Sequence, residues 1–141
     1  MNIHQISVFL ENRTGQLAEI AKLLADNNID IRALSIAETS DYGLARMIVD
    51  DAHKASAVLL AHGDILSMTP VWAVEVPDAP GGLADLLALL AAEQVDVEYM
   101  YSLFTHREGL PIWSCGFPTS PNSWAPWGTG KSASSAPKNW A

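Results

Sequence analysis

The sequence predicts an α+β fold built from two tandem βαββαβ units, the second of which is incomplete. When the 141-residue chain is shifted against itself by 66 positions, ten of the positions from 15 to 44 meet an identical residue. Glycines coincide at both ends of the repeat, Gly15 with Gly81 and Gly43 with Gly109, which chance amphipathicity would not reproduce. A second observation limits the repeat, because the apolar pattern and the acidic residues both stop well before the C-terminus.

The first unit opens with a strand and a glycine-marked turn into a helix. Alternating apolar residues predict a strand over Ile3–Leu10. The turn that follows ends at Gly15, and Thr14 is the candidate N-cap. Apolar residues then recur at helical spacing over 17–27, and Asp26-Asn-Asn28 ends the helix.

Four further elements complete the first unit. A strand over Ile29–Ile36 is followed, after a hairpin turn, by a third strand over Leu44–Val49. Asp51 caps a short helix that ends at Gly63, and Ile65–Met68 forms the fourth strand. The order βαββαβ is the ferredoxin-like split βαβ arrangement.

The second unit begins in the same way and then loses the pattern. Its first strand is expected at Val71–Val76, its turn at 77–82, its helix at Leu83–Glu93 and its second strand at Val95–Thr105. The repeat predicts a third strand over about 110–117, but the residues there do not alternate. No second helix or fourth strand is expected after it.

The last residues differ from the rest in composition. Residues 111–141 contain no Asp, Glu, Leu or Val, yet they hold 5 of the 8 prolines and 4 of the 5 tryptophans. Pro, Gly and Ser recur every few residues and block both helix and central strand. We therefore predict a first domain over 1–69, the N-terminal part of a second over 70–110, and an irregular tail over 111–141.

An out-of-frame translation would explain the break at residue 111. Codons permitted for Pro111–Ser120, read one base out of register, can encode Ala-Tyr-Met-Val-Leu-Arg-Val-Ser-Asp-Gln, which alternates like a strand. Codon degeneracy makes this peptide one solution among many, and a natural Pro/Trp-rich tail is the alternative. An incomplete second unit would leave one face of the 83–93 helix and a sheet edge uncovered, so we expect self-association through that edge.

Composition excludes several classes of function. A formal net charge of −8 argues against nucleic-acid binding, because phosphate contacts need clustered Lys and Arg. No apolar run approaches the ~20 residues of a membrane span, and no signal-peptide pattern is present, so a cytoplasmic protein is expected. The single cysteine, Cys115, excludes an internal disulfide and a Cys-based zinc site. No metal, cofactor or catalytic constellation is expected.

Two copies of one turn motif resemble the ACT domain. The motif is Asn12-Arg-Thr-Gly15-Gln-Leu17 in the first unit and Pro77-Asp-Ala-Pro-Gly81-Gly-Leu83 in the second. Over residues 1–110 the chain is most similar to the small stand-alone bacterial proteins made of two tandem ACT domains. This resemblance implies a non-catalytic regulatory protein, expected as a homodimer, that binds a free amino acid, usually in the cleft between two ACT units.

The ligand is expected at these two turns. A glycine-opened helix N-terminus offers free backbone N–H groups and a favourable dipole to a carboxylate. We assign the carboxylate to the Gly15 turn or the Gly81/Gly82 turn, and the ammonium group to Asn12 or Asp78. The alternative is that these glycines only form tight turns. The expected ligand-binding residues are Asn12, Arg13, Thr14, Gly15, Gln16, Leu17, Asp78, Pro80, Gly81, Gly82 and Leu83.

Other functions compete with amino-acid binding. The main alternative is a ferredoxin-like interaction subunit that pairs through its edge strands to regulate a partner enzyme. An enzyme of the acylphosphatase kind would need an Arg in the first turn acting with an Asn on a central strand, and Arg13 alone is not enough. Tyr99 and Tyr101, expected on one strand face beside Trp72, either line a ligand pocket or pack an interface.

Overall fold

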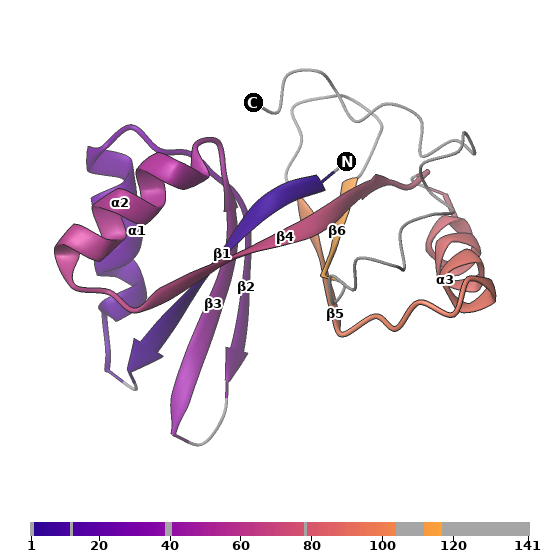
Figure 1. Ribbon diagram of the computed structural model, residues 1–141, viewed down its shortest axis with the longest axis horizontal. Coiled ribbons are helices and arrows are strands. Elements are labelled where there is room, and N and C mark those ends of the chain that lie inside the picture. Colours follow the sequence, from indigo (N-terminus) through magenta and orange to yellow (C-terminus); the bar gives the residue numbers. More distant parts are fainter. Residues whose placement is uncertain (1, 12, 39–40, 78, 104–111, 117–141) are drawn as a thin grey trace. The chain divides into compact units, whose positions relative to one another are not determined.

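A computed structural model describes residues 2–11, 13–38, 41–77, 79–103 and 112–116 (Figure 1). The chain divides into two units. The N-terminal unit spans the described residues of His4–Thr69, and the C-terminal unit is formed by the described residues from Pro70 to 116 together with residues 2–3.

The N-terminal unit has the predicted βαββαβ order, with two helices on one face of an antiparallel sheet (Figure 1). The strand order is β2-β3-β1-β4, and β3 pairs antiparallel with both β1 and β2. The ferredoxin-like prediction is therefore confirmed. The elements are β1 (Asn2–Glu11), α1 (Gln16–Asp26), β2 (Ile31–Glu38), β3 (Tyr42–Val49), α2 (Ala52–His62) and β4 (Leu66–Glu75).

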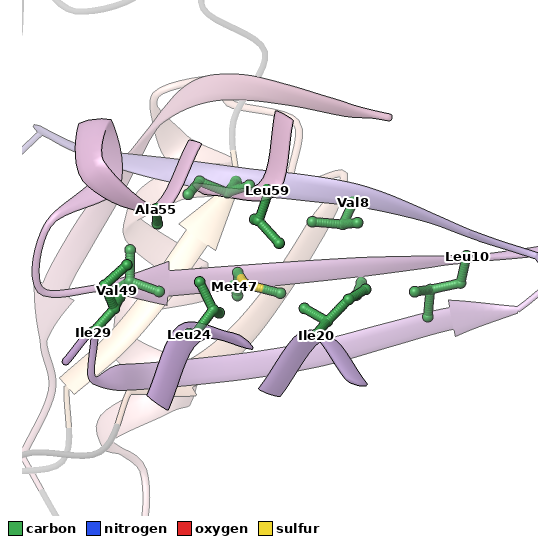
Figure 2. Packing of buried hydrophobic residues seen from close by; sticks show 11 residues of the cluster. Val8, Leu10, Ile20, Leu24, Ile29, Met47, Val49, Ala55 and Leu59 are labelled. Carbon is green, nitrogen blue, oxygen red and sulfur yellow. The ribbon is translucent and has the colours of Figure 1, made fainter. Parts of the chain in front are cut away.

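The core of the N-terminal unit lies between this sheet and the two helices. Ile20 and Leu24 of α1 and Leu59 of α2 are fully buried there against Val8 and Met47 of the sheet (Figure 2). The period of four between Ile20 and Leu24 places both on one helix face, and alternation along β1 and β3 gives the sheet its apolar side. Burial of these side chains holds α1 and its N-terminal turn against the sheet.

The ends of α2 confirm the sequence prediction. The Asp51 carboxylate accepts a hydrogen bond from the backbone N–H of Lys54 at 3.0 Å, so it caps the helix. Gly63 ends the helix in the left-handed conformation, with φ of 96°.

The C-terminal unit repeats the first half of this arrangement. It contains the rest of β4, α3 (Gly82–Ala92), β5 (Tyr99–Leu103) and β6 (Ile112–Gly116), with strand order β4-β6-β5. Helix α3 begins and ends at the positions that the sequence repeat assigns to the two ends of α1. Its buried Leu86 and Leu90 pack against Val74 and Val76, which forms a second core cluster.

The expected break between the two units does not interrupt β4. The sequence predicts separate strands at 65–68 and 71–76, whereas one continuous strand runs from Leu66 to Glu75. The φ angle that a proline ring imposes is compatible with extended backbone, so Pro70 does not end the strand.

A strand also lies inside the stretch predicted to be an irregular tail. β6 pairs antiparallel with both β4 and β5, and it takes the place of the third strand of the repeat. The prediction of irregular structure is therefore wrong for 112–116. Pairing with two neighbours uses the backbone alone, whereas the prediction relied on alternating side chains. Residues 111 and 117–141 lie outside the described residues.

The register of β6 is offset by two positions from the sequence repeat. Met47 lies opposite Ile6 in the N-terminal unit, and Cys115 lies opposite Trp72 in the C-terminal unit. Ile6 and Trp72 are equivalent in the repeat, but the equivalent of Met47 is Trp113, two positions before Cys115. Because the offset is even, each position of β6 keeps the sheet face of its counterpart in β3.

The aromatic side chains of the C-terminal unit do not form the patch that was predicted. Tyr99 and Tyr101 share a face, with ring centroids 6.5 Å apart. Trp72 lies in register with Met100, which places it on the opposite face, where both residues pack against the core cluster below α3. The expectation that Trp72 lies beside the two tyrosines is therefore wrong.

Two adjacent leucines of α2 test the assigned core. Leu59 is fully buried and Leu60 is 59% exposed. We expect Leu59→Ala to lower the free energy of unfolding by about 2–5 kcal/mol, and Leu60→Ala by less than about 0.5 kcal/mol. Urea titrations followed by circular dichroism measure both, and similar losses for the two variants would contradict the assigned helix face.

Candidate functional site

The two predicted turns have similar but not identical backbone structures. Gly15 and Gly81 stand immediately before α1 and α3, with φ of 88° and 91°. This left-handed region is readily adopted by glycine and strained for residues with a Cβ atom. A Cβ atom added at either glycine would lie more than 4 Å from every described residue beyond its chain neighbours, so among the described residues the space beside both turns is open.

The backbone hydrogen bonds of the two turns also correspond one to one. Each bond of the first turn has a counterpart between the equivalent residues of the second, and the lengths differ by at most a few tenths of an ångström. In the first turn the backbone N–H donors and carbonyl acceptors pair as Arg13 to Glu11, Gln16 to Arg13 and Glu19 to Gly15. In the second turn they pair as Ala79 to Pro77, Gly82 to Ala79 and Asp85 to Gly81.

Neither α1 nor α3 has a side-chain cap. Gly15, and not the predicted Thr14, is the N-cap of α1, because the left-handed turn places the glycine at the helix start. Within the described part of the chain, the backbone N–H groups of Leu17 and Ala18 donate to no acceptor. The same holds for the N–H groups of the two residues that follow Gly82. These helix starts differ in this respect from α2, which Asp51 caps.

An ion pair spans the first turn. The Arg13 guanidinium donates hydrogen bonds of 2.9 and 3.0 Å to the two carboxylate oxygens of Glu19, in the first turn of α1. The hydrogen bond from Arg13 lowers the pKa of Glu19, and the charge of Arg13 adds to that effect. Arg13, predicted as a ligand-binding residue, therefore already has a carboxylate partner. The sequence analysis missed Glu19, although an acidic residue early in a helix is a recognisable signal.

The residue after each left-handed glycine differs between the turns. Gln16 is 9% exposed, and its Oε1 is buried with no hydrogen-bond partner in the described structure. At the matching position of the second turn, a Cβ atom on Gly82 would lie 2.4 Å from the carbonyl oxygen of Pro77. The second turn therefore excludes any side chain where the first has a buried amide.

The remaining predicted residues divide into three groups. Leu17 and Leu83 are half-buried and pack against the two core clusters, so only their backbone N–H groups face the turn. Pro80 and Thr14 are exposed. Asn12 and Asp78, the predicted ammonium acceptors, lie outside the described residues.

The described residues contain no group of three or more His, Cys, Asp or Glu side chains that could hold a metal ion. Nor does any helix among them have the length and apolar character needed to cross a bilayer.

The Arg13–Glu19 pair predicts a pH dependence. Because the folded-state pKa of Glu19 is lowered, the pair stabilises the fold above the ordinary carboxyl pKa of about 4.3. This contribution is lost as the pH falls through the lowered pKa. An NMR titration of the Glu19 carboxyl carbon should give a midpoint below the ordinary value in the wild type and a higher midpoint in Arg13→Gln. An unchanged midpoint in Arg13→Gln would show that the pair does not form in solution.

Solved structures similar to this chain include one with substantial sequence identity. A protein of Bacteroides thetaiotaomicron is 40% identical with a TM-score of 0.76, and the match covers 82% of this chain and 79% of that one. The regulatory subunits of aspartate kinase from Thermus thermophilus and Thermus flavus are each 18% identical, with TM-scores of 0.62 and 0.57. Each of these two matches covers 79% of this chain, and they cover 81% and 80% of the respective subunits. At this identity the two subunits share the fold alone. No curated protein matches the chain.

A family model described as an ACT domain pair matches residues 1–119, which takes in both glycine turns and β6. The repeated helix starts and the ferredoxin-like sheet agree with that match, and the chain belongs to the ACT domain pair family.

Proposed function

We propose that the protein is a non-catalytic regulatory protein that binds a free amino acid at a glycine-opened helix N-terminus. The observation that carries this proposal is the pair of unpartnered backbone N–H groups at Leu17 and Ala18, counted among the described residues. Membership of the ACT domain pair family supports it, as does the name of the Thermus thermophilus neighbour, a regulatory subunit.

The chemistry of the turn suits an amino-acid carboxylate. The two N–H groups lie in the first turn of α1, at the positive end of the helix dipole, where a carboxylate binds favourably. Hydrogen bonds to a charged acceptor are stronger than those between neutral groups. The Arg13 guanidinium is engaged by Glu19, so the backbone supplies the anion contacts in this proposal. Asn12 or Asp78 remains the proposed acceptor for the ammonium group.

A panel of the twenty L-amino acids tests this function. We expect at least one to raise the melting temperature of the full chain and to give heat in a calorimetric titration. The double variant Gly15→Ala/Gly81→Ala should lose this response, because the added methyl groups occupy the open space beside each turn.

Gly63→Ala is the matched control, since Gly63 is also left-handed with open space around it but stands at the end of α2. It should lose stability through the same backbone strain, about 1–2 kcal/mol per residue, and still bind. If no amino acid stabilises the wild type, the proposed function is wrong.

The exposed edge of the sheet favours a second candidate, an interaction subunit for a partner enzyme or a second copy of the chain. β2 is the outermost strand of the N-terminal unit, and its Leu34 and Ile36 are 39% and 46% exposed. An edge strand offers unpaired backbone groups, and exposed apolar residues beside them favour pairing with another chain. We also propose a cytoplasmic location, supported by the presence of a single cysteine.

We further propose the domain division 1–69 and 70–110, with 111–141 translated out of frame. The exposure of Leu89 supports the out-of-frame translation. Leu89 is 47% exposed, whereas its counterpart in the repeat, Leu23, is partly buried against a core cluster that includes residues of α2. A second unit with its own counterpart of α2 would cover that helix face. An out-of-frame sequence is compatible with the strand β6, because β6 pairs through its backbone with both β4 and β5.

Resequencing the gene tests the frame. We expect a single-base insertion or deletion near codon 111 relative to close relatives. The chain translated in the restored frame should melt at a higher temperature, because apolar side chains such as Leu89 become covered at about 25 cal/mol per Å². An unbroken frame shared with relatives would leave the natural tail as the explanation.

A further inference from the structure

Two histidines that are far apart in the sequence meet in the N-terminal unit. The ring centroids of His4 in β1 and His53 in α2 are 5.7 Å apart, and the two ring planes are tilted by 55°. His4 lies two positions before Ile6, a residue of the core cluster beneath the helices, so alternation along β1 places His4 on the same face of the sheet. His53 is the second residue of α2. The contact therefore joins the start of β1 to the first turn of α2.

Both imidazoles are available to an external ligand. His4 and His53 are exposed, and among the described residues neither ring makes a hydrogen bond or an ion pair. His62, at the other end of the same helix, differs in this respect, because its Nδ1 lies 2.8 Å from Asp64 Oδ2. Imidazole nitrogen is the commonest side-chain metal ligand in proteins. Two neighbouring rings with nitrogens that the described fold does not use are therefore candidates to share a metal ion.

The separation of the rings suits one shared ion. A Zn²⁺ ion bound to an imidazole nitrogen lies about 3.2 Å from the ring centre, so two rings on one tetrahedral ion have centres about 5.2 Å apart. The observed separation is larger by about half an ångström, which small rotations of two exposed side chains can close. Rings stacked in parallel planes cannot direct their in-plane lone pairs at one point, whereas tilted rings such as these can.

The charge of the surroundings favours a cation. The chain has a formal net charge of −8, which attracts cations to its surface. Asp51 stands two residues before His53, and its carboxylate at the N-cap offsets the positive end of the α2 dipole. No third His, Cys, Asp or Glu side chain joins the pair within the described part of the chain. Water would therefore occupy the remaining coordination positions, as it does the open position of catalytic zinc sites.

We infer that His4 and His53 form a binding site for one divalent transition metal ion of the class that prefers imidazole nitrogen, such as Zn²⁺. The site lies apart from both glycine turns and does not depend on the proposed function. Because its two ligands come from β1 and α2, the ion binds the folded N-terminal unit and links the sheet to the helix. Binding of this kind stabilises the folded state.

Titration of the full chain with Zn²⁺ tests the site. We expect Zn²⁺ to raise the melting temperature, and calorimetry to detect one ion whose binding needs both histidines. His4→Gln and His53→Gln should each weaken this binding by about tenfold or more, since loss of a group that merely supports a metal ligand already has that effect. Both side chains are exposed, so the metal-free variants should melt like the wild type. Mg²⁺, which prefers oxygen ligands, should cause no shift.

His62→Gln is the matched control, because it removes another exposed imidazole from the same unit and should leave the affinity for Zn²⁺ unchanged. NMR gives a readout that does not depend on the variants. Zn²⁺ should shift the ring signals of His4 and His53 over the same range of concentration and leave the ring of His62 unaffected. A wild type that binds no Zn²⁺, or binding that survives both His4→Gln and His53→Gln, would overturn the inference.

Discussion

The left-handed glycine before each repeated helix is the constraint on which the site and the packing both depend. Gly15 and Gly81, each with a positive φ, stand at the end of a short turn and set the direction in which the chain enters the helix. That direction sets the rotation of α1, so that Ile20 and Leu24 face the sheet. The same conformation brings the helix start into the open without a capping side chain. The helix thus combines a buried face with a start that no side chain of its N-cap residue covers.

The contrast with α2 shows what this geometry costs. A capping side chain stabilises a helix by about 1 kcal/mol, and α2 gains this through Asp51. Helix α1 lacks such a cap, and the Arg13–Glu19 ion pair ties the turn to its first residues from the solvent side instead. An exposed pair of this kind contributes little stability. The fold thus tolerates an unsatisfied helix start, which is the condition under which a carboxylate can compete for it.

The sequence predicted those parts of the structure that local rules determine. The turns at Gly15 and Gly81 and the helices that follow them could be predicted, because a glycine turn and a helical spacing of leucines depend only on residues close together in the sequence. The repeat indicated a strand over about 110–117, but the side chains there do not alternate, and the pairing of β6 with β4 and β5 joins segments far apart in the chain. The same limit applied to the site. The Arg13–Glu19 pair and the burial of Gln16 depend on how α1 lies on the sheet, which no spacing of residue types records.

The repeat therefore conserves the backbone hydrogen-bond pattern of its two turns without conserving their side chains. The backbone hydrogen bonds of the two turns match one to one. The residue after the glycine nevertheless differs: it is the buried Gln16 in the first turn, and Gly82 in the second, where no side chain fits. The Pro77 carbonyl oxygen lies so close to Gly82 that any substitution at Gly82 would force the turn to change its backbone conformation. The two helix starts are thus chemically unequal at the position after the glycine, and also at the Arg13–Glu19 ion pair, whose counterparts in the repeat are Ala79 and Asp85.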